Sequence, residues 1–316
     1  MTGFLARRAP SIALVLFISS ILAFALPRLA PGNVAVVLAG PDANAASVAA
    51  ISQQLGLNRS PVVQYWDWIF GLFHGNLGQS YLLHRSVASV IGGRLESTLE
   101  LAVLSMILVI LIGMTLGVLA GGSVRSGWAR SVLDVTNSSL IAIPSFLVGL
   151  ALILVFGIYH RWLPVSGEAS ILQNPQIGIQ YLILPALALA LAPAAVVARM
   201  LQTEMLRVRH EEFIDLAVSK GASSTRTTFR HVLRNSLGTA VVAIGLQFGH
   251  VLAGAVIIEA IFARNGLGQL AVSSVQNHDY PVLQVLIVGF VFVAVLSQLL
   301  TEVALAALDP RIRLGG

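Results

Sequence analysis

Six long apolar runs, separated by polar segments, recur from one end of the chain to the other. A helix needs about 20 mostly apolar residues to cross a bilayer, and it satisfies its own backbone N–H and C=O groups there. Pro144, Pro185 and Pro193 fall inside two of the runs, which membrane helices tolerate when neighbouring groups take up the freed carbonyls. The sequence therefore predicts an all-α integral membrane protein with about six transmembrane helices. The runs lie at residues 9–28, 99–121, 134–158, 179–198, 238–261 and 282–306.

The composition excludes a soluble protein of this size. Only 10% of the 316 residues are charged, whereas a soluble domain carries about a quarter. No polar stretch is long enough for a separate core, so we expect one transmembrane domain over residues 1–316. The net charge of +5 does not indicate nucleic-acid binding, because the basic residues are strung between apolar runs rather than clustered on one face.

The distribution of basic residues predicts the orientation. With both termini and every second loop in the cytoplasm, most of the 19 basic residues lie inside, as the positive-inside rule requires. Both termini should then be cytoplasmic, with an external loop at about 31–97 and a cytoplasmic loop at about 199–236. The basic residues left outside are Arg28, Arg59, Arg85, Arg94, Arg161 and Arg264.

The first apolar run and the external loop have features of their own. The run is too long for a signal peptide and Ala43-Asn44-Ala45 lies too far downstream, so we expect it to be retained. Within the external loop, residues 55–57 and 65–73 are predicted to form short helices, the second with an aromatic face suited to the membrane interface.

The cytoplasmic loop has the pattern of a helix, a sharp turn and a second helix. Gly221 is expected to end the first helix, because glycine adopts the left-handed conformation freely. Ser223 or Ser224 can cap a second helix through Arg234. Such a loop either docks in a groove on a partner or is a solvated connector, and the pattern alone favours the connector. The apolar stripe is formed by Met205, Phe213, Leu216 and Ala217, and the polar side by Glu212, Asp215, Ser219 and Lys220.

A family resemblance changes that balance. Asp215-Leu216-Ala217, followed after three residues by Gly221, is similar in spacing to the Glu-Ala-Ala-x-x-x-Gly loop of binding-protein-dependent ABC importer permeases. Only Ala217 and Gly221 are strict matches. Further segments of the chain resemble the oligopeptide, dipeptide and nickel subfamily. Within it they resemble the dipeptide permease B-type subunit, which has a long first external loop. These are residues 31–33, 54–57, 64–65, 75–80, 230–237, 254–262, 266–268, 278–281 and 308–313.

The resemblance implies the type I ABC importer permease fold and a coupling helix that docks on an ATPase. It also implies a second homologous permease, two ATPase domains or subunits, an extracytoplasmic peptide-binding protein and transport by alternating access in the bacterial cytoplasmic membrane. The expected ATPase-coupling residues are Glu212, Asp215, Ala217, Lys220, Gly221, Arg230, Arg234 and Asn235. Arg230 and Arg234 could equally hold the inner interface.

Some positions depart from the family pattern. Asn33 and Asn76 stand where the family has Asp, Asn265 replaces the proline before Gly-Leu-Gly, and Thr239 replaces the proline after the coupling loop. These departures put in doubt the substrate details and the start of the fifth span, not the family.

The chain is expected to have no ATPase site, cofactor or metal site of its own. Its only lysine, Lys220, lies outside the pattern of a phosphate-binding loop, so ATP and Mg belong to partner subunits. An ion-coupled secondary transporter would need ionisable residues near the middle of the bilayer, but the acids lie mainly at the span margins. An intramembrane enzyme is disfavoured because neither His-Glu-x-x-His nor Gly-x-Ser-x-Gly occurs.

Two polar residues are candidates for the transport pathway. Gln247 and His250 lie three apart near the middle of the fifth run, so they should face the bundle interior or a watery path rather than lipid. Di- or oligopeptides are the expected cargo, with nickel or another small solute as the alternative. Nickel is less favoured because His74 and His84 are the only scattered histidines of the outer loop.

Overall fold

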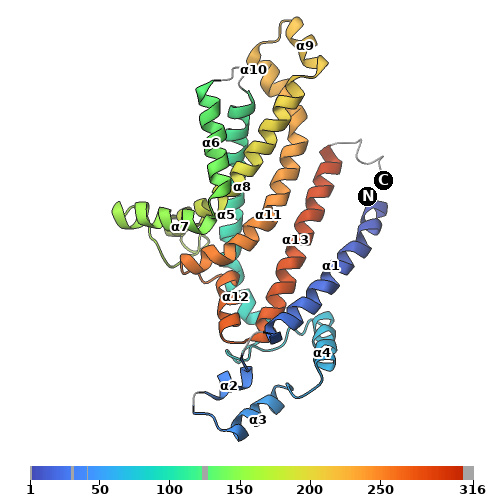
Figure 1. The fold of residues 1–316 in the computed structure, drawn as a ribbon, viewed down its shortest axis with the longest axis vertical. Helices are drawn as coiled ribbons and strands as arrows, with labels where there is room; N and C mark the ends of the chain where they lie inside the picture. The colour runs from blue at the N-terminus through green and yellow to red at the C-terminus, as the bar shows by residue number, and fades with distance from the viewer. Residues whose placement is uncertain (1, 30–31, 41, 123–126, 309–316) are drawn as a thin grey trace. The chain divides into compact units, whose positions relative to one another are not determined.

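The computed structural model describes residues 2–308 apart from 30–31, 41 and 123–126 (Figure 1). Among the segments compared above, Pro31 and residues 309–313 lie outside the described residues. The described part of the chain is helical, with one isolated bridge between Gln79 and Ser86. The all-α prediction is confirmed; the placement of both termini in the cytoplasm stays a prediction.

The helices follow in a simple order along the chain. Those near the N-terminus are α1 (Thr2–Leu29), α2 (Val34–Ala39), α3 (Ala45–Gln54), α4 (Pro61–Phe73) and α5 (Val87–Gly122). The middle holds α6 (Trp128–Ala142), α7 (Ser145–Leu152), the π-helical η1 (Ile153–Tyr159), α8 (Pro175–Arg209) and α9 (Glu212–Ser219). The rest are α10 (Ser224–Arg226), the π-helical η2 (Thr227–Leu233), α11 (Arg234–Ile261), α12 (Leu267–Gln276) and α13 (Tyr280–Leu308).

Five of these helices, in the described residues, are long and apolar enough to cross a membrane. The number is six if the pair Ser131–Ala142 and Ser145–Tyr159 is counted as one broken span. The five are Arg8–Leu29, Val87–Gly122, Pro175–Arg209, Ser224–Ile261 and Tyr280–Leu305.

The third predicted span, 134–158, is wrong as a continuous helix. Its two halves meet at an angle of 102°. Pro144 has no backbone N–H and forces the preceding residue out of the helical region, and Ile143 is accordingly extended, with φ −84° and ψ 122°. Pro185 and Pro193, in contrast, lie inside the continuous helix α8, as predicted.

The chain forms two compact units. Unit 1 consists of Met1–Thr98 and Asn265–Val295, and unit 2 of Leu99–Arg264 and Leu296–Gly316. Because the boundaries fall inside α5 and α13, each of these helices contributes to both units. A single membrane domain over the whole chain remains a prediction.

The core of unit 2 is organised around α8. It packs against α11, α6 and α7 (Figure 1), and buried Leu182, Leu189 and Val197 on α8 form one cluster with Val251 and Ile258 of α11. Such a helix, buried along most of its length, is the central element of the unit.

Small residues bring α5 directly against α8. Gly113, Gly117 and Gly121 repeat every four residues, and a Cβ at Gly113 would lie 2.9 Å from the carbonyl oxygen of Ala194. At Gly121 it would lie 2.9 Å from Cβ of Met205. This is the small-residue repeat that lets membrane helices approach closely, and it explains why α5 needs no side chain on that face.

Unit 1 contains two sets of contacts. Helix α1 packs against α4, and the start of α5 packs against α12 and α13. The Ser20 hydroxyl lies 2.8 Å from the Tyr65 hydroxyl, and the rings of Phe24 and Tyr65 meet edge to face at 5.4 Å. Val87 packs with Leu270 and Val282 in a separate buried cluster. The aromatic helix predicted at 65–73 is confirmed as part of α4.

Several predicted boundaries differ from the structure. The helix predicted at 55–57 is wrong, because α3 ends at Gln54 and Gly56 has a φ of +67°. Helix α5 begins at Val87, inside the predicted external loop. The second loop helix does not end at Arg234 but continues through η2 into α11, because no break separates Arg234 from the apolar run.

Candidate functional site

The loop between α8 and α11, residues 210–233, is named the coupling loop here after its predicted role. It turns sharply around α9. Glu211 precedes α9, and Glu212 and Asp215 lie in its first turn, where the helix dipole favours negative charge. Ile214 is the buried anchor and packs with Met205 of α8 and Val232 of η2. The loop therefore stands on a small apolar core of its own.

Gly221 closes α9 through a paired hydrogen-bond motif. Its amide donates to the carbonyl oxygen of Val218 at 2.9 Å, and the amide of Ala222 donates to that of Ala217 at 3.1 Å. Gly221 has a φ of +84°, the left-handed conformation that this motif requires. The spacing from Ala217 to Gly221 thus has a local physical cause, since the two positions are the ends of one helix cap.

The second half of the loop begins with a capped turn. The Ser223 hydroxyl accepts a hydrogen bond from the amide of Arg226, so of the two predicted caps it is Ser223 that caps α10. Thr227 and Thr228 are buried at the start of η2. The turn from α9 into η2 is therefore short. It is fixed at one end by the cap of α9 and at the other by the Ser223 cap and the buried threonines.

Arg209 connects the loop to α5. Its guanidinium donates to the carbonyl oxygen of Gly122 at 2.9 Å and to the Thr228 hydroxyl at 3.1 Å. The last carbonyls of a helix have no partner within the helix, and a basic side chain can supply one. From the sequence, Arg209 is only one of the basic residues of the loop, because nothing in the pattern predicts that the ends of α5 and α8 meet.

The outer face of the loop is apolar. The side chains of Phe213, Leu216 and Val218 are 43%, 55% and 55% exposed, and Phe229 of η2 is exposed as well. The predicted stripe is wrong in one respect: Met205 is buried in α8, and the break at His210 separates it from α9.

The predicted coupling residues lie around this face. Glu212, Asp215, Lys220 and Gly221 are exposed, whereas Ala217 is half-buried. Arg230 and Arg234 are exposed and form no ion pair within the described part of the chain. Asn235 donates to the carbonyl oxygen of His231 at 2.7 Å. Their role in coupling to an ATPase stays a prediction.

The two predicted pathway residues differ in their surroundings. Gln247 is 7% exposed, whereas His250 is exposed, with Nδ1 3.2 Å from the carbonyl oxygen of Leu246. Gln247 therefore faces the interior of the bundle, one of the two predicted alternatives, and a watery path lined by the exposed His250 stays a prediction. Positions three apart lie only about 60° from each other around the helix axis, so Gln247 lies within the buried face and His250 just beyond its edge.

A buried charged cluster lies elsewhere in unit 2. The Arg264 side chain is fully buried, and its guanidinium lies 3.8 Å from Glu100 and 4.0 Å from Glu168. Glu259 is also fully buried. Burial lowers the pKa of Arg264, while the neighbouring glutamates act in the opposite direction. The sequence placed these groups only at span margins, because a loop must fold back before Glu168 can approach Arg264.

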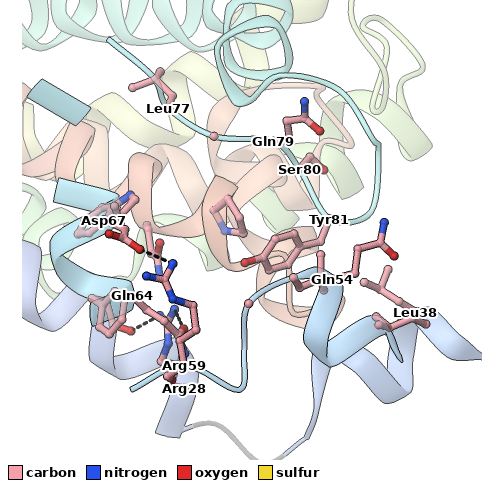
Figure 2. Close-up of a pocket in the computed structure, with 18 of the residues that line it drawn as sticks. Arg28, Leu38, Gln54, Arg59, Gln64, Asp67, Leu77, Gln79, Ser80 and Tyr81 are labelled. Atoms are coloured by element: carbon pink, nitrogen blue, oxygen red, sulfur yellow. Dashed lines mark hydrogen bonds and ion pairs between the residues drawn. The ribbon is translucent and has the colours of Figure 1, made fainter. Parts of the chain in front are cut away.

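Unit 1 contains an outer pocket, defined here as the cavity of about 600 Å³ lined by α1, α3, α4 and the segment 77–84 (Figure 2). Arg28 donates to the carbonyl oxygen of Phe24 at 2.7 Å and to Oε1 of Gln64 at 3.1 Å. Its guanidinium stacks over the Phe24 ring, 3.5 Å from the centroid. No pattern in the sequence singled out Arg28 beyond its charge.

The wall opposite Arg28 is held by a buried carboxylate. Asp279 accepts hydrogen bonds from the Ser80 hydroxyl and, at 3.0 Å, from the amide of Tyr81. This places Tyr81 in the pocket, with its hydroxyl pointing toward the side that holds Arg28 and Gln64 (Figure 2). Burial raises the pKa of Tyr81, so the phenol is a neutral hydrogen-bond donor near neutral pH.

These features define a class: a helical, multi-pass membrane protein with a structured loop between two spans. The comparisons identify the family. Residues 113–314 match the model described as binding-protein-dependent transport system inner membrane component, and residues 1–102 match its N-terminal companion. The chain belongs to this family and is a multi-pass component of the bacterial inner membrane.

Curated relatives match over almost their full length. A probable peptide ABC transporter permease protein, y4tP of Sinorhizobium fredii, is 37% identical over 99% of this chain and 100% of its own. The glutathione transport system permease protein GsiC of Escherichia coli is 36% identical over 99% of both. These similarities confirm the predicted resemblance.

The fold has solved counterparts. An inward-facing structure of the MetNI methionine ABC transporter contains a chain that matches 70% of this one and 96% of its own length, with a TM-score of 0.59 and 16% identity. A second crystal form of that transporter matches with a TM-score of 0.57. The prediction of the ABC importer permease fold is confirmed.

Proposed function

We propose that this chain is one permease subunit of an ATP-driven importer for di- or oligopeptides. The relatives named as peptide and glutathione permeases support the cargo class. The chain would pair with a second homologous permease and receive peptide from an extracytoplasmic binding protein. Two partner ATPase domains would bind and hydrolyse ATP with Mg. This chain would supply the path for the peptide and no catalytic group.

The observation that carries the proposal is the coupling loop. Its exposed apolar side chains Phe213 and Leu216, three positions apart on α9, form the kind of helix face that inserts into a groove on a partner. The cap at Gly221 and the clamp by Arg209 make the loop stiff enough to transmit movement to α8 and α11. ATP binding would then shift these helices and alternate the access of the path.

Reconstitution tests the proposal directly. The purified assembly in liposomes, with its binding protein and enclosed ATP, should take up a radiolabelled peptide and hydrolyse ATP faster when peptide is added. This chain alone should move no peptide. Peptide flux through liposomes containing only this chain would contradict the proposal, as would an assembly in which peptide never stimulates ATP hydrolysis.

A further inference from the structure

The outer pocket carries an uncompensated positive charge. Of the charged side chains that line it, Arg59 and Asp67 form an ion pair at 2.6 Å and cancel each other. Arg28 contacts a carbonyl, an amide oxygen and an aromatic ring, and forms no ion pair with an acid of the described residues. A half-buried guanidinium is stabilised when a carboxylate approaches it, because two parallel N–H···O bonds can form.

The pocket walls also carry hydrogen-bond donors besides Arg28. The exposed side-chain amides of Gln54 and Gln79 belong to residues that line the pocket. The neutral Tyr81 hydroxyl is a further donor on the opposite wall. Asp279 does not accept hydrogen bonds from these donors, since its carboxylate accepts from the Ser80 hydroxyl and from the amide of Tyr81. The complementary ligand is therefore an acceptor with negative charge.

The size and lining of the pocket suit a short peptide. A cavity of about 600 Å³ lies within the range of about 300–1,000 Å³ for small-molecule sites. Leu38, Ile51 and Leu55 supply apolar surface, and side-chain amides such as Gln54 and Gln79 can pair with peptide bonds. A carboxylate end, amides and apolar side chains are the three parts of a peptide that these walls match.

We propose that the outer pocket binds the C-terminal end of a short peptide, with Arg28 pairing with its carboxylate. This proposal rests on the proposed peptide-import function and adds to it a peptide site on the permease itself. It assigns Arg28 to substrate binding and Tyr81 to a donor position on the opposite wall.

The test compares two probes on the wild-type assembly without its binding protein. Trialanine carries the free carboxylate, and trialaninamide differs only in that group. Equilibrium binding to the assembly in nanodiscs should favour trialanine by about tenfold to a hundredfold, the range of charged hydrogen bonds. Equal binding of the two probes would overturn the proposal without any variant that could misfold.

Variants then locate the preference. In Arg28→Gln the advantage of trialanine should disappear, and Arg28→Lys should keep part of it. The matched control is Arg85→Gln, because Arg85 is exposed, bonds to Ser89 and does not line the pocket. A full preference for trialanine in Arg28→Gln would contradict the assignment.

The outcomes separate the two proposals. If trialanine binds only when the binding protein is present, while uptake proceeds, the pocket does not take free peptide and only this inference fails. If Arg28→Gln weakens association with the binding protein instead, the carboxylate comes from that protein and the inference again fails. If no peptide is taken up or stimulates ATP hydrolysis, the proposed function itself fails.

Discussion

At the scale of single residues, the coupling loop depends on two residues, Gly221 and Arg209, that stabilise it in different ways. Gly221 supplies a backbone conformation, whereas Arg209 supplies hydrogen bonds across three segments. Gly221 was predicted from the sequence because its effect is local. Arg209 was not, because its partners on α5 and η2 are distant in sequence.

Replacing Gly221 by valine should impair coupling without a steric clash. No atom lies within 4 Å of a Cβ built there, so the cost is the left-handed φ of +84°, about 1–2 kcal/mol for a residue with a side chain. Peptide-stimulated ATP hydrolysis should fall while membrane insertion stays normal. Gly221→Asn should lose less, since asparagine tolerates this conformation. Full stimulation in the valine variant would contradict the role of the turn.

Replacing Arg209 by glutamine should loosen the coupling loop. Charged hydrogen bonds contribute about 1.5–3 kcal/mol each, so hydrogen–deuterium exchange over residues 212–226 should rise. The matched control is Arg207→Gln, whose ion pairs with Glu204 and Glu211 are exposed and therefore weak, because water screens them. Equal exchange in both variants would show that Arg209 is no clamp.

At the scale of elements, glycine spacing decides which helices pack. The repeat Gly113, Gly117 and Gly121 faces α8 at distances that exclude a larger side chain. The pattern of apolar residues does not reveal this feature, since the second half of α5, which holds the repeat, is apolar almost throughout. The repeat itself is visible in the sequence, but its partner is not.

Replacing Gly113 by leucine should destabilise unit 2. A Cβ there would meet the Ala194 carbonyl oxygen at 2.9 Å, and overpacking of this kind costs about 1–3 kcal/mol or more. The thermal transition of the purified protein should drop, as followed by circular dichroism. Thr115→Leu is the control, because Thr115 is exposed on the same helix. An unchanged transition in Gly113→Leu would argue against close α5–α8 packing.

At the scale of the whole molecule, much exposed apolar surface needs an explanation. Lipid accounts for it on the spans, but α9 is an eight-residue helix outside them. An exposed apolar face on a polar loop is the signature of a partner site. The proposed ATPase partner would cover it.

Replacing Leu216 by serine should weaken the assembly. Leu216 is 55% exposed beside Phe213 on α9, and an apolar anchor in an interface contributes more than about 1 kcal/mol. Affinity purification through this chain should retain several-fold less ATPase subunit. Leu172→Ser is the control, since Leu172 is 82% exposed in a different loop of unit 2. Equal retention in both variants would remove α9 as the docking element.

The sequence by itself determined what depends on neighbouring residues: the apolar spans, the stop at Gly221 and a serine cap at position 223 or 224. It also carried the family, because the motifs recur in order along the chain. Only the tertiary structure decided which helices meet, that Pro144 bends its span by 102°, and that Arg209, Arg28 and Arg264 find their partners. The physical reason is distance along the chain: lipid solvation and backbone conformation act locally, whereas packing and buried charge pairs join segments far apart in sequence.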